Sequence, residues 1–268
     1  MHHRRDFIRR IGLGLAAVPL LSACGDAAGD DDGVVDAPPT TADAPAAGAW
    51  ASGGTAAMTD KASYPDPFTA TPTACALIAT TTEGPCTTAT GLAREDVSEG
   101  LTGLPVRLAL KIVDASCAPL AGATVKIWHT NLEGSYSGET PNPNMCLTTS
   151  AYSAQNFMRG TQVTAADGTA FFDTCFPGWY RGRAVHIHIQ VLRGNVSTRV
   201  SQLFFPEAIT TDIFDTHPEY RSYGQPDTTF ATDNILRGIP SADQARMLFD
   251  VARMTDGAML ASKVVTVA

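Results

Sequence analysis

The sequence has little charge, and most of the charge it has is negative. Charged residues make up 17% of its 268 positions, and 19 Lys and Arg stand against 27 Asp and Glu, a net charge of −8. No basic stripe is present that could neutralise a row of phosphates, so nucleic acid is a poor candidate partner. The 17 prolines and 23 glycines suit strands joined by turns better than a helical bundle.

The apolar run near the N-terminus is too short to span a bilayer. Ile11 to Ala23 covers 13 residues, the length of a signal-peptide core. It follows Arg4-Arg-Asp-Phe-Ile-Arg9, which resembles a twin-arginine export motif, and it leads into Leu21-Ser-Ala-Cys24, which resembles a lipobox. We therefore expect residues 1–23 to be removed. Lipidated Cys24 would then anchor the mature protein at the cell envelope, on the periplasmic or outer side, and the net charge would become −11 because four Arg and one Asp are lost.

Large apolar side chains are nearly absent between Gly25 and Ala62, where Ala, Asp, Gly, Pro and Thr dominate. Such a segment cannot bury enough surface to offset the entropy lost on ordering. The composition predicts a disordered tether over residues 24–62 and one folded domain over residues 63–268.

A CxxC pair is also missing, which argues against a cysteine-ligated zinc site. Five cysteines remain after Cys24, and outside the cytoplasm they are free to form disulfides. An odd number leaves at least one unpaired or bonded to another chain, and the spacing does not define the connectivity. These are Cys75, Cys86, Cys117, Cys146 and Cys175.

Alternating apolar residues predict several strands. Val106, Leu108, Leu110 and Ile112 would share the buried face of a strand over residues 105–113, and residues 123–130 would form the next. Asp-Gly pairs at 167–168 and 256–257 indicate two hairpins, the first joining residues 161–164 to 169–173 and the second closing the chain. The sum is an all-β sandwich of mostly antiparallel strands with long loops.

The remaining chain is organised around His186-Ile187-His188, inside the apolar run Val185–Val191. Side chains alternate faces along a strand, so the two imidazoles lie on one face, about 6.6 Å apart, where one metal ion can bridge them. A pair of hydrogen-bonded structural histidines is the alternative. Tyr180 and Arg183, just upstream, favour a site, and Tyr136 in a glycine-bracketed turn offers another oxygen ligand.

This set resembles the intradiol ring-cleavage dioxygenases, the catechol and protocatechuate dioxygenase family, and in particular its secreted single-chain members. The resemblance covers roughly residues 75 to 230 in family order. The matching stretches are Gly122-Ala-Thr-Val-Lys-Ile-Trp-His129, Glu133-Gly-Ser-Tyr-Ser-Gly138, Arg159-Gly-Thr-Gln162, Pro177-Gly-Trp-Tyr-Arg-Gly-Arg183, His186-Ile-His188 and Gln202-Leu-Phe-Phe-Pro206.

By resemblance, Fe(III) is held by Tyr136 and His188 in the equatorial plane and by Tyr180 and His186 on the axis. The substrate would be a catechol-type aromatic, which would displace Tyr180, and dioxygen would be the co-substrate. The product would be a muconate-type diacid, as in the catabolism of aromatic compounds. Arg183 would stabilise developing negative charge, and Gln202 would face the iron. Two imidazoles and two phenolates also form a hard donor set that suits ferric iron better than zinc or Cu(I).

His129 is not needed as a ligand, and we interpret it as structural. The sequence departs from the family's usual pattern at four positions, which concerns the shape of the substrate pocket more than the metal. These are Cys86, Thr130, Asn131 and Glu139. The rival hypothesis is a non-catalytic, surface-tethered β-sandwich binding module, which the fold alone permits. The sequence leaves open both the choice of catechol and a homo-oligomeric state.

Strand geometry sets a condition on Gln202, because opposite residues of an antiparallel pair share a face. A two-residue turn would pair Arg193 with Val196 and point Gln202 away from the metal. A three-residue loop, Arg193-Gly-Asn195, or a bulge with the same effect, puts Gln202 across from His186. We predict the second arrangement.

Overall fold

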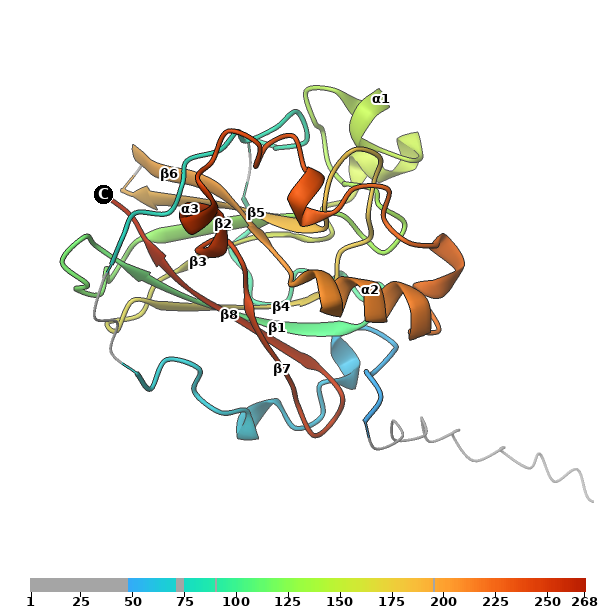
Figure 1. Ribbon diagram of the computed structural model, residues 1–268, viewed down its shortest axis with the longest axis horizontal. Coiled ribbons are helices and arrows are strands. Elements are labelled where there is room, and N and C mark those ends of the chain that lie inside the picture. The colour runs from blue at the N-terminus through green and yellow to red at the C-terminus, as the bar shows by residue number, and fades with distance from the viewer. Residues whose placement is uncertain (1–47, 71–74, 90, 195) are drawn as a thin grey trace, which may run out of the picture. The chain divides into compact units, whose positions relative to one another are not determined.

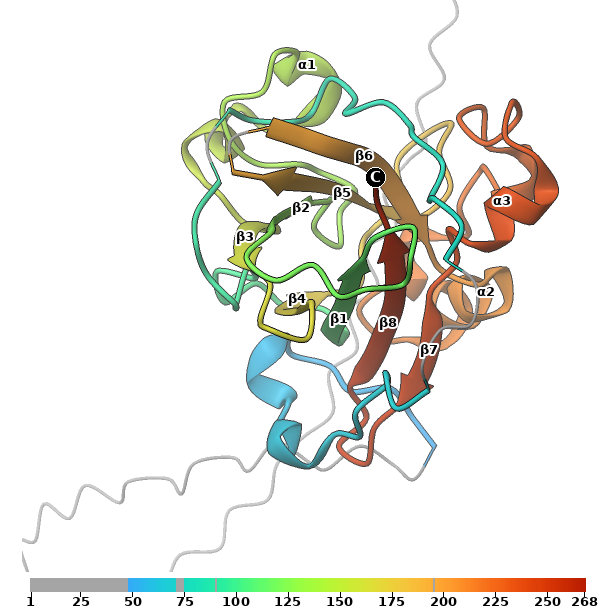
Figure 2. The same ribbon diagram turned by 90° about the vertical axis from the view of Figure 1, so that its left-hand side faces the viewer.

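Two four-stranded sheets form the body of the computed structural model, which describes residues 48–70, 75–89, 91–194 and 196–268. Figures 1 and 2 show the sheets as two packed layers. One sheet has the order β4-β1-β8-β7, and the other has the order β3-β2-β5-β6. Every pairing is antiparallel except that of β1 with β8, which confirms the predicted all-β sandwich. The strands are β1 Pro105–Val113, β2 Thr124–Trp128, β3 Arg159–Val163, β4 Thr169–Cys175, β5 His186–Arg193, β6 Val196–Phe204, β7 Asp250–Arg253 and β8 Met259–Thr266.

The core lies between the layers, and alternation along each strand fills it. The four predicted inward residues of β1 are fully buried, and they meet Ile187, Ile189 and Val191 of β5 in one apolar cluster. Because the side chains of β5 alternate, His186 and His188 lie on the opposite face of their sheet. Loops cover that face as well, so both histidines are buried.

Helices are short and lie outside the sheets (Figure 1). They are α1 Pro143–Cys146, α2 Glu207–Thr216 and α3 Ser241–Ala245, with 3-10 turns at Thr55–Ala57, Lys61–Ser63, Ser150–Ala154, Arg221–Tyr223 and Phe230–Thr232. Within the described ranges, no helix has the length and apolarity needed to cross a membrane.

The predicted closing hairpin is confirmed, because β7 pairs with β8 across residues 254–258. The hairpin predicted at Asp167-Gly168 is wrong. The chain does turn tightly there, with Gly168 at φ 79° and its N–H on the carbonyl of Ala165 at 2.9 Å. However, β3 pairs with β2 while β4 pairs with β1, so this turn carries the chain from one sheet to the other.

The predicted tether extends too far. The signal peptide, Cys24 and the first part of the tether lie outside the described residues, but residues 48–62 pack on the folded domain. The Trp50 indole donates to Asp212 at 3.1 Å, and the N–H of Ala51 donates to the carbonyl of Gly257 at 2.8 Å. The Lys61 ammonium reaches Asp173 at 2.5 Å. Hydrogen bonds and the ion pairs of Lys61 with Asp173 and Glu95 hold this segment, so its lack of large apolar residues is a poor guide to its order.

Four of the five cysteines pair within the domain. Cys75 bonds to Cys117 and Cys86 bonds to Cys146, while Cys175 is free and buried. This agrees with the expectation that at least one thiol of the five has no intrachain partner.

Candidate metal centre

The two histidines of β5 present one ring nitrogen each to a common point. The Nδ1 of His186 lies 2.6 Å from the carbonyl oxygen of Ala184. Because a carbonyl only accepts, Nδ1 carries the proton, and Nε2 is left as a lone-pair donor. Nε2 of His186 and Nε2 of His188 are 3.2 Å apart, so strand alternation brings both imidazoles to the same place.

A sharp loop after β2 delivers Tyr136. The Asn131 side chain accepts the N–H groups of Glu133 and Ser135 at 3.1 and 3.0 Å, which closes the loop. Gly134, inside this loop, has φ 78°, and a Cβ on it would lie 2.1 Å from the carbonyl oxygen of Trp179. Only glycine therefore lets this loop approach the segment that carries the second tyrosine.

Tyr180 comes from the connection between β4 and β5, and its hydroxyl closes the cluster. The Tyr136 and Tyr180 hydroxyls lie 3.4 Å apart, and each is 3.4 Å from Nε2 of His186. The structure thus brings together the four predicted ligands, which come from two loops and one strand.

The spacing and chemistry of these donors fit a metal ion. Atoms bound at about 2 Å from one ion lie roughly 3 to 3.5 Å from one another. Among the residues that the structure describes, no group of three or more His, Cys, Asp or Glu could hold a metal. Two neutral imidazoles with two phenolates are hard donors that suit Fe(III).

Burial keeps the cluster uncharged until a cation arrives. It raises the pKa of Tyr136 well above 10, with the neighbouring Tyr180 adding to the effect, and it also raises the pKa of Tyr180. Burial, reinforced by the nearby cation of Arg183, lowers the pKa of His186 well below 6.5, and burial followed by His186 does the same to His188. At neutral pH the imidazoles are ready ligands, whereas the phenols release their protons only to a cation.

A buried carboxylate that the sequence analysis missed fixes Arg183. Both oxygens of Asp233 accept from Nε of Arg183, at 3.0 and 3.3 Å, and one also accepts the N–H of Ala184 at 2.8 Å. The remaining nitrogens of Arg183 donate to Gln202 and, at 3.4 Å, to the Tyr180 hydroxyl. Hydrogen bonds to these three side chains fix the position of the guanidinium beside the cluster.

Gln202 lies on the face of the sheet that carries His186 and His188, as predicted, and of the two predicted arrangements the structure has the bulge. Arg193 pairs directly with Val196, so the predicted three-residue loop is wrong. A bulge follows, in which Val191 pairs with Arg199 and Leu192 with Ser197. The extra residue shifts the register, so Gln202 pairs with His188 rather than His186. The amide also donates to the carbonyl of Thr82 at 3.2 Å.

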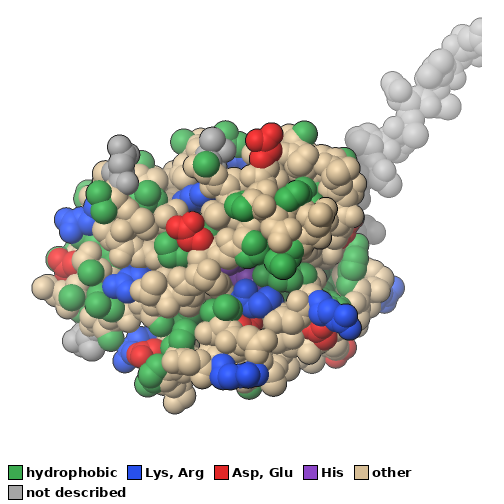
Figure 3. All heavy atoms as spheres, turned by 90° about the horizontal axis from the view of Figure 1, so that it is seen from above, with side chains coloured by type: hydrophobic (Ala, Val, Ile, Leu, Met, Phe, Trp, Pro, Cys, Tyr) green, Lys and Arg blue, Asp and Glu red, His purple; other side chains and the backbone are tan. Residues whose placement is uncertain are grey.

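A cavity of about 500 Å³ opens onto the cluster. Figure 3 shows purple histidine atoms at the bottom of a hollow bordered by apolar and basic side chains. Tyr136, Tyr180 and His188 line the hollow, and Pro85 and Ile235 are among its apolar residues. Its size is that of a small-molecule pocket.

The loop that contains α1 reaches the cavity. Met145 and Cys86 line the cavity, and the Cys86–Cys146 disulfide ties α1 to the segment around Cys86. The carbonyl of Cys146 also accepts the N–H of Tyr136 at 2.9 Å, so the disulfide supports a predicted ligand.

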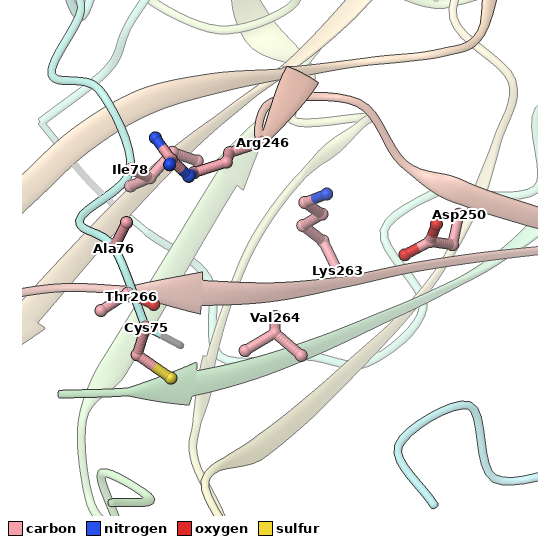
Figure 4. Close-up of a pocket in the computed structure, with 8 residues that line it drawn as sticks. All are labelled: Cys75, Ala76, Ile78, Arg246, Asp250, Lys263, Val264 and Thr266. Carbon is pink, nitrogen blue, oxygen red and sulfur yellow. The ribbon is translucent and has the colours of Figure 1, made fainter. Parts of the chain in front are cut away.

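A second cavity, of about 190 Å³, lies along β8 beside the other disulfide. Figure 4 shows Arg246, Asp250 and Lys263 on its wall, with Cys75 at its edge. No histidine or tyrosine lines it, so it offers nothing comparable to the donor cluster.

His129 is outside the cluster and engages both ring nitrogens, as a structural histidine does. Nδ1 lies 2.8 Å from the carbonyl of Thr130, and Nε2 lies 2.8 Å from the hydroxyl of Thr174. Since Nδ1 holds the proton, the Thr174 hydroxyl donates to Nε2. Burial lowers the pKa of this buried ring to about 4.

Fold and site together define a β-sandwich with a histidine–tyrosine cluster under a small-molecule pocket. Residues 81–217, just over half of the chain, match the profile of the dioxygenase family Dioxygenase_C. The chain belongs to this family, that of the intradiol ring-cleavage dioxygenases.

Individual relatives agree with this assignment. The intradiol ring-cleavage dioxygenase of Tetranychus urticae superposes with a TM-score of 0.63 at 26% identity, covering 72% of this chain and 95% of its own. Catechol 1,2-dioxygenase of Pseudomonas arvilla C-1, at 19% identity, shares the fold with a TM-score of 0.50, covering 70% of this chain and 61% of its own. Chlorocatechol 1,2-dioxygenase of Rhodococcus opacus is 26% identical over 39% of this chain and 50% of its own length. The chain thus spans about half the length of that curated relative.

Proposed function

We propose that this protein is an intradiol dioxygenase that uses Fe(III) and O2 to open a catechol-type aromatic to a muconate-type diacid. The observation that carries the proposal is the convergence of four donor atoms: Nε2 of His186 lies 3.2 Å from Nε2 of His188 and 3.4 Å from the hydroxyls of Tyr136 and Tyr180, which are 3.4 Å apart. A ferric ion held there would activate a chelated catechol toward dioxygen.

Tyr180 is suited to act as the exchangeable ligand. Tyr136 is almost completely buried, whereas Tyr180 is partly exposed and its hydroxyl receives a hydrogen bond from Arg183. If a catechol takes its place, the departing phenolate can accept the proton of the catechol hydroxyl, because its own pKa is raised.

Arg183 supplies a fixed positive charge beside the exchangeable position. An ion pair with Asp233 and a hydrogen bond to Gln202 fix its position, so it need not reorganise when negative charge develops on the substrate. The apolar residues of the cavity would exclude water and pack against the aromatic ring.

We also propose that the protein is exported and lipid-anchored through Cys24. Two disulfides in the folded domain support an oxidising compartment. Metabolic labelling with a radioactive fatty acid should mark the full-length protein, and Cys24→Ser should abolish the label.

The enzymatic proposal is tested by loading the protein with ferric iron. The loaded protein should absorb visible light through phenolate-to-iron charge transfer and consume oxygen with at least one member of a panel of substituted catechols. A colourless protein that binds no iron would instead favour a non-catalytic binding module.

A further inference from the structure

A buried arginine lies against the ring of Tyr136. The guanidinium carbon of Arg159 is 5.7 Å from the centre of that ring, and only 3% of the residue is exposed. Arg159 opens β3 and pairs across the sheet with Trp128. It does not line the substrate cavity.

Neutral groups account for all the hydrogen bonds of this guanidinium. Nε donates to the carbonyl and hydroxyl oxygens of Ser137 at 2.9 and 3.2 Å, and Nη2 donates to the carbonyl of Cys86 at 2.6 Å. Nη1 is buried and has no hydrogen-bond partner among the described residues. One donor of a buried cation is thus unsatisfied, which is costly and calls for an explanation.

Arg159 also lacks a carboxylate partner within the described part of the chain. By contrast, Arg94 pairs with Glu99, Arg107 with Asp173, and Arg183 with Asp233. An unpaired buried charge costs several kcal/mol, and an arginine cannot escape that cost by losing its proton at neutral pH. Burial lowers the pKa of Arg159 to about 10, and the group that opposes this shift is Tyr136.

We infer that Arg159 is the fixed counter-charge of the Tyr136 phenolate in the metal-bound protein, and hence a positioning residue for the metal centre. This inference rests on the proposed iron site. The positive charge of the guanidinium offsets the negative charge of the phenolate, and it lies on a face of the tyrosine ring that neither substrate nor solvent reaches. Because Tyr136 is the more buried of the two phenols, it is the one that most requires such compensation.

The inference predicts the direction of a spectral change. Charge transfer moves electron density from the phenolate to the iron. A cation beside the phenolate stabilises density on the ring and raises the transition energy. Removing the cation should therefore move the visible band to longer wavelength.

The test uses the iron-loaded full-length protein and three variants. Arg159→Lys keeps the charge, Arg159→Gln keeps donors for the carbonyls but loses the charge, and Arg159→Met fills the volume without either. The matched control is Arg94→Gln, because Arg94 also donates to backbone carbonyls, those of Arg159 and Asn156, while its charge is paired with Glu99.

Both neutral variants should show a red-shifted band, while Arg159→Lys and Arg94→Gln keep the wild-type maximum. The same shift in a Tyr180→Phe background assigns it to Tyr136. If one neutral variant does not fold, the other carries the comparison. An unshifted band in a folded neutral variant, or an equal shift in Arg94→Gln, overturns the inference. Absence of a visible band from iron-treated wild type would instead contradict the proposed function.

Discussion

The indole of Trp128 stacks on the imidazole of His188, with ring centres 4.7 Å apart and planes 8° from parallel. Nδ1 of His188 is buried and has no hydrogen-bond partner in the part of the chain that the structure describes, in contrast to Nδ1 of His186, which donates to the carbonyl of Ala184. One proposed ligand is therefore oriented by a hydrogen bond and the other by an aromatic face.

Replacing that face should weaken metal binding. In Trp128→Leu we expect the iron dissociation constant to rise by about 10- to 100-fold, as for other groups that orient a ligand. Trp128→Phe keeps a flat surface and should lose less. Competition with a chelator measures both. Phe172→Leu, in the main core cluster rather than in the one that holds Trp128 and Tyr136, controls for lost packing, and an equal loss of iron there would contradict the role of the stack.

Asp233 should matter for turnover and not for metal retention. Asp233→Asn removes the charge that holds Arg183, and a displaced catalytic cation costs about 10- to 100-fold in kcat/KM. The resting iron content should stay near wild type. Steady-state oxygen consumption and metal analysis check this. The control is Asp243→Asn, whose carboxylate, on α3, pairs with the exposed Arg246, and it should behave as wild type.

The two phenols should respond differently to removal of the hydroxyl. Tyr136→Phe should lose iron or ring cleavage outright. Tyr180→Phe should keep some iron, but its turnover should collapse because the phenolate that would accept the proton of the catechol hydroxyl is missing. Iron content and oxygen uptake are measured in parallel. Tyr152→Phe, which loses only a hydroxyl bonded to Glu133, serves as the control. Full activity in Tyr180→Phe would contradict its assignment as a ligand.

His129 should make the metal-free protein less stable in acid. Its pKa is about 4 when folded and about 6.5 when unfolded, so above pH 6.5 neither state is protonated and stability is unaffected. As the pH falls from 6.5 to 4, only the unfolded chain gains this proton, and roughly 3 kcal/mol of stability is lost. His129→Gln should lose less over that range, as urea unfolding at pH 7 and pH 4.5 would show. Parallel losses in both proteins would contradict this.

Local patterns were sufficient for the core and for the face of the sheet that carries the histidines. A period of two along β5 places His186 and His188 together and Ile187 in the core, and this holds whatever the rest of the chain does. The position of Gln202 was harder, because its register depends on a bulge between Ser197 and Arg199 that no turn residue signals. Its face was predicted correctly and its partner was not.

Long-range packing decided what the sequence analysis missed. Asp233 is 50 positions from Arg183 in a segment without a motif, so nothing local links the two. Arg159 stood in a recognised stretch, but that it is buried without a carboxylate appears only in three dimensions. The same holds for β3 and β4, whose turn was recognised although their separation into two sheets was not.

The central claim is that the chain uses ferric iron to open a catechol between its two hydroxyl-bearing carbons. Iron-loaded protein should be given catechol under ¹⁸O₂ and the product analysed by mass spectrometry. The account predicts a muconate-type diacid that carries two heavy oxygen atoms, one in each carboxyl group. A ring-opened aldehyde from cleavage beside the diol, or a folded, iron-replete protein that leaves every tested catechol intact, would contradict it.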